Sequence, residues 1–240
     1  MAGAYLLELF GLTPYTEALA LQRSLAGAVS QQAIPDTVIM LEHEPVITLG
    51  RRTDEGELHV PAGVAVDIVE TNRGGKSTYH GPGQLVCYPI LDLKRHGTDL
   101  KRYVRDLERA IIATLGAFSL EATTIDGLTG VWIPGSAAAP PRKIASIGVH
   151  ASRWVTTHGY ALNVDLDPAP FTDWITACGL EDASFTTIAA ELGRPVTVAE
   201  VRPAAVSALG EVFGLTFEVL PAADGAGLWA QPVHEKLAAR

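Results

Sequence analysis

The sequence predicts a mixed α/β fold, of the α/β or α+β class, in a single domain that spans residues 1–240. The expected strands and helices do not alternate strictly, as they would in a doubly wound sheet. Several neighbouring strands are joined by short turns, which favours antiparallel or mixed pairing. Hydrophobic residues make up 48% and charged residues 19% of the chain, which is typical of a globular protein with a substantial core.

The first half of the chain begins with an apolar strand over 5–10. A helix is expected to follow at Thr13-Pro14, with the threonine as N-cap and the proline at the first helical position. Its apolar stripe contains Tyr15, Ala18, Leu19, Leu25, Ala26 and Val29. Further strands are expected over 37–41, 46–49, 64–69 and 84–91.

The second half begins with a long helix at about 99–118. The apolar face of this helix contains Leu100, Val104, Leu107, Ile111 and Leu115. Strands are expected over 125–133, 144–149, 154–164 and 216–220, with 144–149 and 154–164 paired as a hairpin. Two helices, 187–192 and 198–213, are indicated by Gly193 after the first and by the capping pattern Thr197-x-x-Glu200 before the second.

Composition excludes several classes of function. The net charge of −9 argues against broad nucleic-acid binding, which needs a basic surface. No apolar run approaches the roughly 20 residues of a membrane span, and the first residues lack the basic flank of a signal peptide. Two cysteines without metal-ligand spacing fit a reducing compartment and predict no metal site. We therefore expect a cytoplasmic protein that binds neither nucleic acid nor membrane. We also expect no cofactor.

A glycine-rich segment over 73–84, Arg-Gly-Gly-Lys-Ser-Thr-Tyr-His-Gly-Pro-Gly-Gln, is the richest candidate for chemistry. Glycines allow backbone N–H groups to approach a ligand closely. A surface turn with incidental polar residues is the alternative. The segment is not a Walker loop, because Glu70 occupies the position of its first glycine.

Lys143 enters the apolar run Ile144-Ala145-Ser146-Ile147-Gly148. Partial burial would favour its neutral amine and make the side chain useful as a base. From these residues alone, a lysine at a strand end with its ammonium in water is the more economical interpretation.

Cys178 precedes a glycine, so we expect it at a turn, where a thiol can be exposed. Cys87 lies in the apolar strand Leu85-Val86-Cys87-Tyr88 and suits an inert core thiol. A lone cysteine is more often a buried apolar residue than a nucleophile, so this feature does not decide the function alone.

Together these segments resemble the octanoyltransferase (lipoyl(octanoyl) transferase) family of lipoate biosynthesis. The matching pieces occur in the family's order between about residues 41 and 192. They are 73–75 with 78–84, 143–148, 153–164 (Arg-Trp-Val-Thr-Thr-His-Gly-Tyr-Ala-Leu-Asn-Val) and Ala177-Cys178-Gly179. One departure is Ala177, where members usually carry proline.

The resemblance implies a fold similar to the catalytic domain of biotin and lipoate protein ligases. It implies transfer of octanoyl from acyl carrier protein to the lysine of lipoyl domains, in 2-oxoacid dehydrogenase complexes and the glycine cleavage protein. Cys178 would form the thioester, with Lys143 as its catalytic partner. The implied substrate-binding residues are Arg73, Gly74, Gly75, Lys76, Ser77, Thr78, Tyr79, His80, Ser146, Ile147, Gly148, His158, Gly159, Tyr160 and Ala161.

Three other functions remain open at this point. An ATP-dependent lipoate or biotin ligase would share the fold and the Arg-Gly-Gly loop but would need no nucleophilic cysteine. An acyl-binding scaffold would hold octanoyl without covalent labelling, and a cysteine hydrolase would release free octanoate. His80 either positions substrate and relays protons or holds its loop by hydrogen bonds. An acidic partner could dock on the basic side chains Lys94, Arg95, Lys101, Arg102, Arg105 and Arg109.

Overall fold

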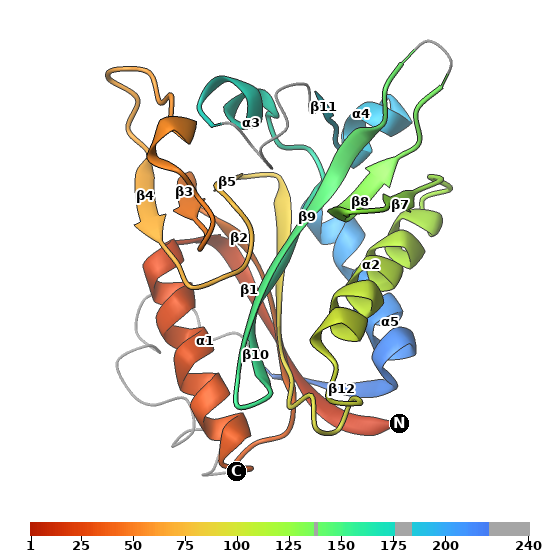
Figure 1. Cartoon of the computed structure of the whole chain (residues 1–240). Coiled ribbons are helices and arrows are strands. Elements are labelled where there is room, and N and C mark those ends of the chain that lie inside the picture. Colours follow the sequence, from red (N-terminus) through yellow and green to blue (C-terminus); the bar gives the residue numbers. More distant parts are fainter. Residues whose placement is uncertain (137–138, 176–183, 221–240) are drawn as a thin grey trace.

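A large mixed sheet forms the centre of the molecule (Figure 1). The computed structural model describes residues 1–136, 139–175 and 184–220. In the sheet the strand order is β12 (Leu215–Leu220), β1 (Ala2–Thr13), β2 (Thr37–His43), β6 (Gln84–Ile90), β10 (Val155–Asn163), β9 (Arg142–Ser152), β8 (Leu128–Ile133) and β7 (Thr123–Ile125), and β11 (Ser184–Phe185) pairs with β9. The β1 strand is parallel to both β12 and β2, and β11 is parallel to β9, whereas the other pairs are antiparallel. The predicted mixed α/β fold is therefore confirmed.

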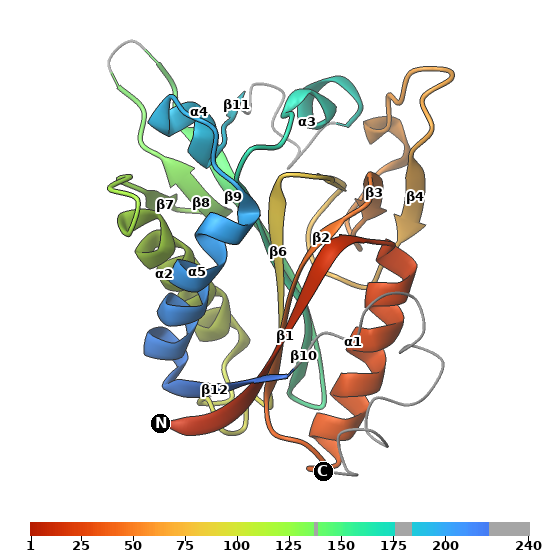
Figure 2. The same ribbon diagram turned by 180° about the vertical axis from the view of Figure 1, so that it is seen from behind.

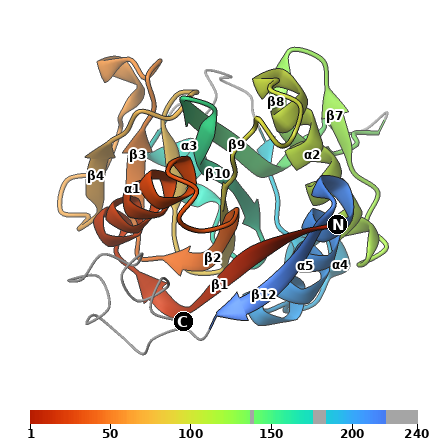
Figure 3. The same cartoon turned by 90° about the horizontal axis from the view of Figure 1, so that it is seen from below.

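Helices cover both faces of the large sheet (Figures 2 and 3). The helix α1 (Tyr15–Ser30) packs on one face, and α2 (Leu100–Gly116) and α5 (Val198–Phe213) pack on the other. Side chains alternate between the two faces along β2, so both faces are apolar and both need a cover. Val38 and Met40 face α2 and α5, while Ile39 and Leu41 face α1. Central strands buried on both sides are therefore continuously apolar rather than alternating.

A smaller sheet stands beside the large one and holds part of the glycine-rich segment. Its strand order is β4 (Asp67–Glu70), β3 (Val46–Leu49) and β5 (Thr78–His80). The short helical elements are η1 (Glu55–Glu57), α3 (Ala169–Asp173) and α4 (Ile188–Leu192). No helix in the described part of the chain is both long and apolar enough to span a bilayer.

The predicted hairpin pairing and the predicted cap of the last helix are confirmed. The β9–β10 hairpin pairs Ser152 with Val155 across its turn. The Thr197 side chain caps α5 by accepting a hydrogen bond from the backbone N–H of Glu200, at 3.2 Å.

Several predicted element boundaries are wrong. The expected strand over 125–133 is the hairpin β7–β8, which turns at Asp126-Gly127, a dipeptide typical of tight hairpins. The expected strand over 64–69 begins only at Asp67, and Thr13 ends β1 instead of capping α1. The short elements β5, α3 and β11 lacked a hydrophobic period long enough to detect.

Candidate functional site

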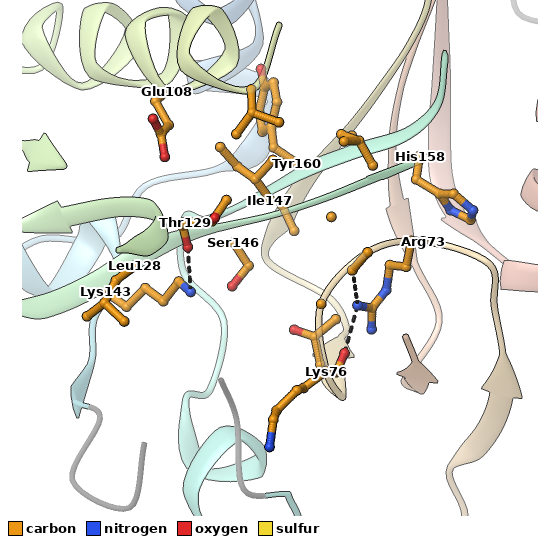
Figure 4. Close-up of a pocket in the computed structure, with 18 of the residues that line it drawn as sticks. Arg73, Lys76, Glu108, Leu128, Thr129, Lys143, Ser146, Ile147, His158 and Tyr160 are labelled. Atoms are coloured by element: carbon orange, nitrogen blue, oxygen red, sulfur yellow. Dashed lines mark hydrogen bonds between the residues drawn. The ribbon is translucent and has the colours of Figure 1, made fainter. Parts of the chain in front are cut away.

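A pocket of about 980 Å³ lies between the glycine-rich loop and α2, with β9 and β10 among its walls (Figure 4). This volume is at the upper end of the range for small-molecule sites, which is roughly 300–1,000 Å³. Most of the residues singled out in the sequence line this pocket. They are Arg73, Gly74, Gly75, Lys76, Ser77, Thr78, His80, Lys143, Ser146, Ile147, Gly148, His158, Gly159, Tyr160 and Ala161.

Tyr79 is the predicted binding residue that is not among the described residues lining the pocket. Successive side chains of a strand point to opposite faces, so Thr78 and His80 face the pocket while Tyr79 faces away. The Tyr79 ring contacts Phe171 and Trp174 edge-on, with ring centroids 5.9 and 5.6 Å apart. Its position is that of a core residue under the loop.

The buried guanidinium of Arg73 fastens the glycine-rich loop. It donates to the carbonyl and hydroxyl oxygens of Thr48 at 2.6 and 2.8 Å, and to the carbonyl of Lys76 at 2.7 Å. The Gly74 N–H donates to the carbonyl of Val149 at 2.9 Å, which ties the loop to β9. A Cβ at Gly148 would lie 3.0 Å from the Gly74 carbonyl oxygen, so glycine permits this close approach.

Lys76 is also held by neighbouring side chains. Its ammonium pairs with the carboxylate of Glu57 and lies 3.8 Å from that of Asp54. The hydrogen bond to Glu57 raises the pKa of Lys76, so this side chain is a charged group at the rim of the pocket.

A buried cluster of rings, which we call the His–Tyr cluster, contains Tyr15, His43, His80, Tyr88 and His158. Burial lowers the pKa of His43 to about 4 and the pKa values of His80 and His158 to about 3. The positive charge of Arg73 adds to the lowering at His80 and His158. All three rings are therefore neutral at neutral pH.

A hydrogen bond selects the tautomer of the neutral His80 ring. His80 Nδ1 lies 2.7 Å from Gln84 Oε1, and Gln84 Nε2 donates to Asn163 Oδ1 at 3.0 Å. Since the Gln84 oxygen only accepts, the proton of His80 is on Nδ1. The structure thus supports a loop-holding role for His80, and its Nε2 retains a lone pair that can accept a hydrogen bond.

Lys143 is buried, with 4% of its surface exposed. Its Nζ donates to the carbonyl of Thr129 at 3.1 Å and lies 5.2 Å from the ring centroid of Trp132 (Figure 4). The interpretation of this side chain as a lysine with its head in water is therefore wrong. The β9 strand has an extra residue between Lys143 and Ala145 relative to β8, and such bulges redirect side chains.

Cys178, the predicted nucleophile, lies outside the described residues. The chain beyond residues 176–183 is fixed directly beside Lys143. Ser184 and Phe185 pair in parallel with Arg142 and Lys143, and the N–H of Thr186 donates to the Lys143 carbonyl at 3.0 Å. The other thiol, Cys87, is buried in β6, and burial raises its pKa to about 12.

The wall opposite the glycine-rich loop was not identified from the sequence. It comprises Leu100, Lys101, Val104, Arg105, Glu108, Thr124, Ile125, Asp126, Gly127, Leu128, Thr129 and Trp132. The 100, 104, 108 spacing of α2 places three of these side chains on one helical face, but only the packing of α2 shows that this face meets the pocket. This wall adds apolar surface and both signs of charge to the pocket.

The predicted basic cluster around α2 is divided. Arg95 pairs with Asp36, while Arg102 and Arg109 pair with Asp106. Lys101 and Arg105 instead line the pocket. Among the described residues, no group of three or more His, Cys, Asp or Glu side chains is arranged to hold a metal ion.

A family model and curated relatives match most of this chain. The family model for the lipoyl protein ligase A/B catalytic domain matches residues 14–210. The chain is 47% identical over 210 residues to an octanoyltransferase from Chloroflexus aurantiacus, covering 85% of this chain and 92% of the relative. It is also 47% identical over 201 residues to an octanoyltransferase from Mycobacterium leprae, covering 84% of each chain.

Solved structures with the same fold are more distant in sequence. A bipartite lipoate protein ligase from Thermoplasma acidophilum, described with its E2 lipoyl domain, has a TM-score of 0.71 at 16% identity, covering 100% of this chain and 91% of the other. A lipoate-protein ligase A bound with ATP has a TM-score of 0.72 at 16% identity, covering 100% and 93%. The predicted similarity to lipoate ligases in fold is confirmed.

Proposed function

Because the chain belongs to the octanoyltransferase family, within the lipoyl protein ligase A/B catalytic domains, it is an acyltransferase, and we propose that it acts through a Cys178 thioester. The proposed donor is octanoyl-acyl carrier protein, and the proposed acceptor is the lysine of a lipoyl domain in the cytoplasm. The observation that carries this proposal is the buried amine of Lys143 in a pocket lined by the motif residues.

In the first half-reaction, the Cys178 thiolate attacks the thioester carbonyl of the octanoyl carrier. A nearby ammonium on Lys143 favours the thiolate. The new C–S bond to Cys178 forms as the C–S bond to the carrier breaks, and the carrier thiolate takes a proton from Lys143. One thioester replaces another, so no ATP is consumed.

In the second half-reaction, the amine of the lipoyl-domain lysine attacks the acyl-enzyme carbonyl. An amide bond forms, and Cys178 leaves as a thiolate. The proton lost by the acceptor nitrogen passes to the neutral Lys143 amine, which restores the ammonium. Backbone N–H groups near Gly75 or Gly148 would stabilise the oxyanion, since the Gly74 N–H is already donated to Val149.

Charge at the rim of the pocket supports an anionic donor. Lys101 and Arg105 are exposed on α2 and line the pocket, although the chain as a whole has a net charge of −9. Within the part of the chain that the structure describes, neither side chain has an ion-pair partner. These two cations are therefore the part of the predicted basic cluster that is available to an acidic carrier.

An ATP-dependent ligase is the main alternative, because solved ligases share the fold. It is disfavoured by the 47% identity to proteins named octanoyltransferase, compared with 16% to the ligase structures. Intact-protein mass spectrometry separates the two functions. We expect octanoyl-carrier to add one acyl group to Cys178, labile to hydroxylamine, and lipoyl domain to remove it. Modification of lipoyl domain that requires free octanoate, ATP and magnesium, without an acyl-enzyme, would overturn the proposal.

A further inference from the structure

We propose that Glu108 is a positioning residue for Lys143, which deepens the proposed function and depends on the assigned role of Lys143. Glu108 lies on the pocket-facing side of α2, far from the motifs that the sequence revealed. Figure 4 shows its carboxylate directed from α2 toward Thr129 and Lys143.

A single peptide group connects the two side chains. The backbone N–H of Gly130 donates to Glu108 Oε1 at 3.1 Å, and the carbonyl of Thr129 accepts from Lys143 Nζ at 3.1 Å. This N–H and this carbonyl belong to the same peptide unit, between residues 129 and 130. A carboxylate on the N–H side polarises the peptide and strengthens its carbonyl as an acceptor. Glu108 therefore acts on the Lys143 amine through this peptide group.

Because of the backbone conformation of Gly130, a hydrogen bond is needed to hold the 129–130 peptide in one orientation. Gly130 has a φ of +126°, which side-chain-bearing residues rarely adopt. Its position against β9 is so close that an added Cβ would lie 2.7 Å from Lys143 Cε. A glycine peptide rotates easily, so the hydrogen bond from Gly130 to Glu108 fixes the direction of the Thr129 carbonyl.

Burial indicates that Glu108 is more than a packing residue. Glu108 is 9% exposed as a residue, and no ion-pair partner of its carboxylate lies within 4 Å among the residues that the structure describes. A buried carboxylate is unfavourable unless its hydrogen bonds compensate for lost hydration. A leucine would fill the same helical face without this penalty, so the acceptor oxygen is the feature that packing does not explain.

The test measures the second half-reaction in single turnovers of pre-formed octanoyl-enzyme with lipoyl domain. Glu108→Leu removes the acceptor, whereas Glu108→Gln keeps an oxygen that can accept from Gly130. Thr114→Ala is the matched control, because Thr114 is buried on α2 but lies outside the pocket-lining residues. We expect Glu108→Leu to slow transfer at saturating lipoyl domain by about tenfold or more, with the half-saturating concentration unchanged. Glu108→Gln should transfer within about threefold of wild type, as should Thr114→Ala.

Three outcomes overturn the inference. They are a normal transfer rate in Glu108→Leu, an equal defect in Glu108→Gln, or a change confined to the half-saturating concentration. If wild type forms no acyl-enzyme, the proposed function fails instead. The crystal structure of Glu108→Leu then decides the positioning role, which requires the 129–130 peptide to turn and Lys143 Nζ to leave the Thr129 carbonyl.

Discussion

Replacement of Gly130 by alanine tests the packing around Lys143. The new Cβ would lie 2.6 Å from the Ala145 carbonyl oxygen and 2.7 Å from Lys143 Cε, closer than real contacts allow. A φ of +126° adds backbone strain. Strain of about 1–3 kcal/mol and overpacking of about 1–3 kcal/mol together predict a loss of about 2–6 kcal/mol in the free energy of unfolding. At roughly 2–4 °C per kcal/mol, this lowers the melting temperature by about 4–24 °C.

Gly214→Ala provides the control for this substitution. Gly214 also has a positive φ, of +66°, but no atom of the described residues lies within 4 Å of its added Cβ. Its substitution should cost only about 1–2 kcal/mol. Both variants lose the same glycine entropy in the unfolded chain, so the difference between them reports the crowding at Lys143 together with the greater backbone strain at a φ of +126°.

Calorimetry and the octanoyl-transfer assay are compared for the two variants. We expect Gly130→Ala to lose stability and most transfer activity, and Gly214→Ala to keep its activity. Equal melting temperatures with full activity in Gly130→Ala would show that Lys143 is not held against this glycine.

Three further variants or conditions give independent predictions. Because His43, His80 and His158 have native pKa values of about 4, 3 and 3, against about 6.5 in the unfolded chain, the unfolded state binds more protons below pH 6.5. Their stabilising contribution is present above pH 6.5 and is lost as the pH falls toward 3–4. Chemical unfolding should therefore show a loss of up to about 2 kcal/mol per histidine between pH 7 and pH 5. Cys87→Ser should still be acylated in the mass-spectrometric assay but should lose about 1–3 kcal/mol, because a hydroxyl is buried in an apolar strand. Arg73→Lys should lose about 3–5 kcal/mol in denaturant unfolding, because one ammonium cannot replace the guanidinium's bonds to Thr48 and the loop.

The results that contradict these predictions are specific. A stability that does not change from pH 7 to pH 5 would mean that the three rings are already charged or exposed. Loss of acylation in Cys87→Ser would show that the assignment of the nucleophile to Cys178 is wrong. Wild-type stability in Arg73→Lys would show that its guanidinium does not brace the loop.

The motif-bearing wall of the pocket could be predicted because each of its segments, 73–80, 143–148 and 158–161, is a short continuous run that resembles a motif of the family. Glycine, histidine and lysine in these short segments were visible as candidates, and the structure brings most of them to one pocket. Tyr79 faces away from the pocket because side chains alternate along β5. This strand has three residues and was too short to be predicted, so the orientation of Tyr79 could not be predicted either.

The opposite wall could not be predicted because it depends on tertiary contacts. In the sequence, Glu108 is one of several charged residues of an amphipathic helix. Only the packing of α2 against β8 brings its carboxylate to the N–H of Gly130. The Asp126-Gly127 dipeptide was an available hairpin signal that would have divided the expected strand over 125–133. The burial of Lys143 likewise depends on β8, which contributes Thr129 and Trp132.

The alkylation rate of Cys178 as a function of pH tests most directly whether a thiolate there depends on Lys143. Iodoacetamide labelling located by mass spectrometry separates Cys178 from the buried Cys87. In wild type we expect the midpoint at least about one pH unit below the value of roughly 8.5 for a free thiol. Lys143→Met should raise this midpoint by about one to three units, because the neighbouring positive charge is lost. Identical midpoints in the two proteins would contradict the proposed catalytic pair.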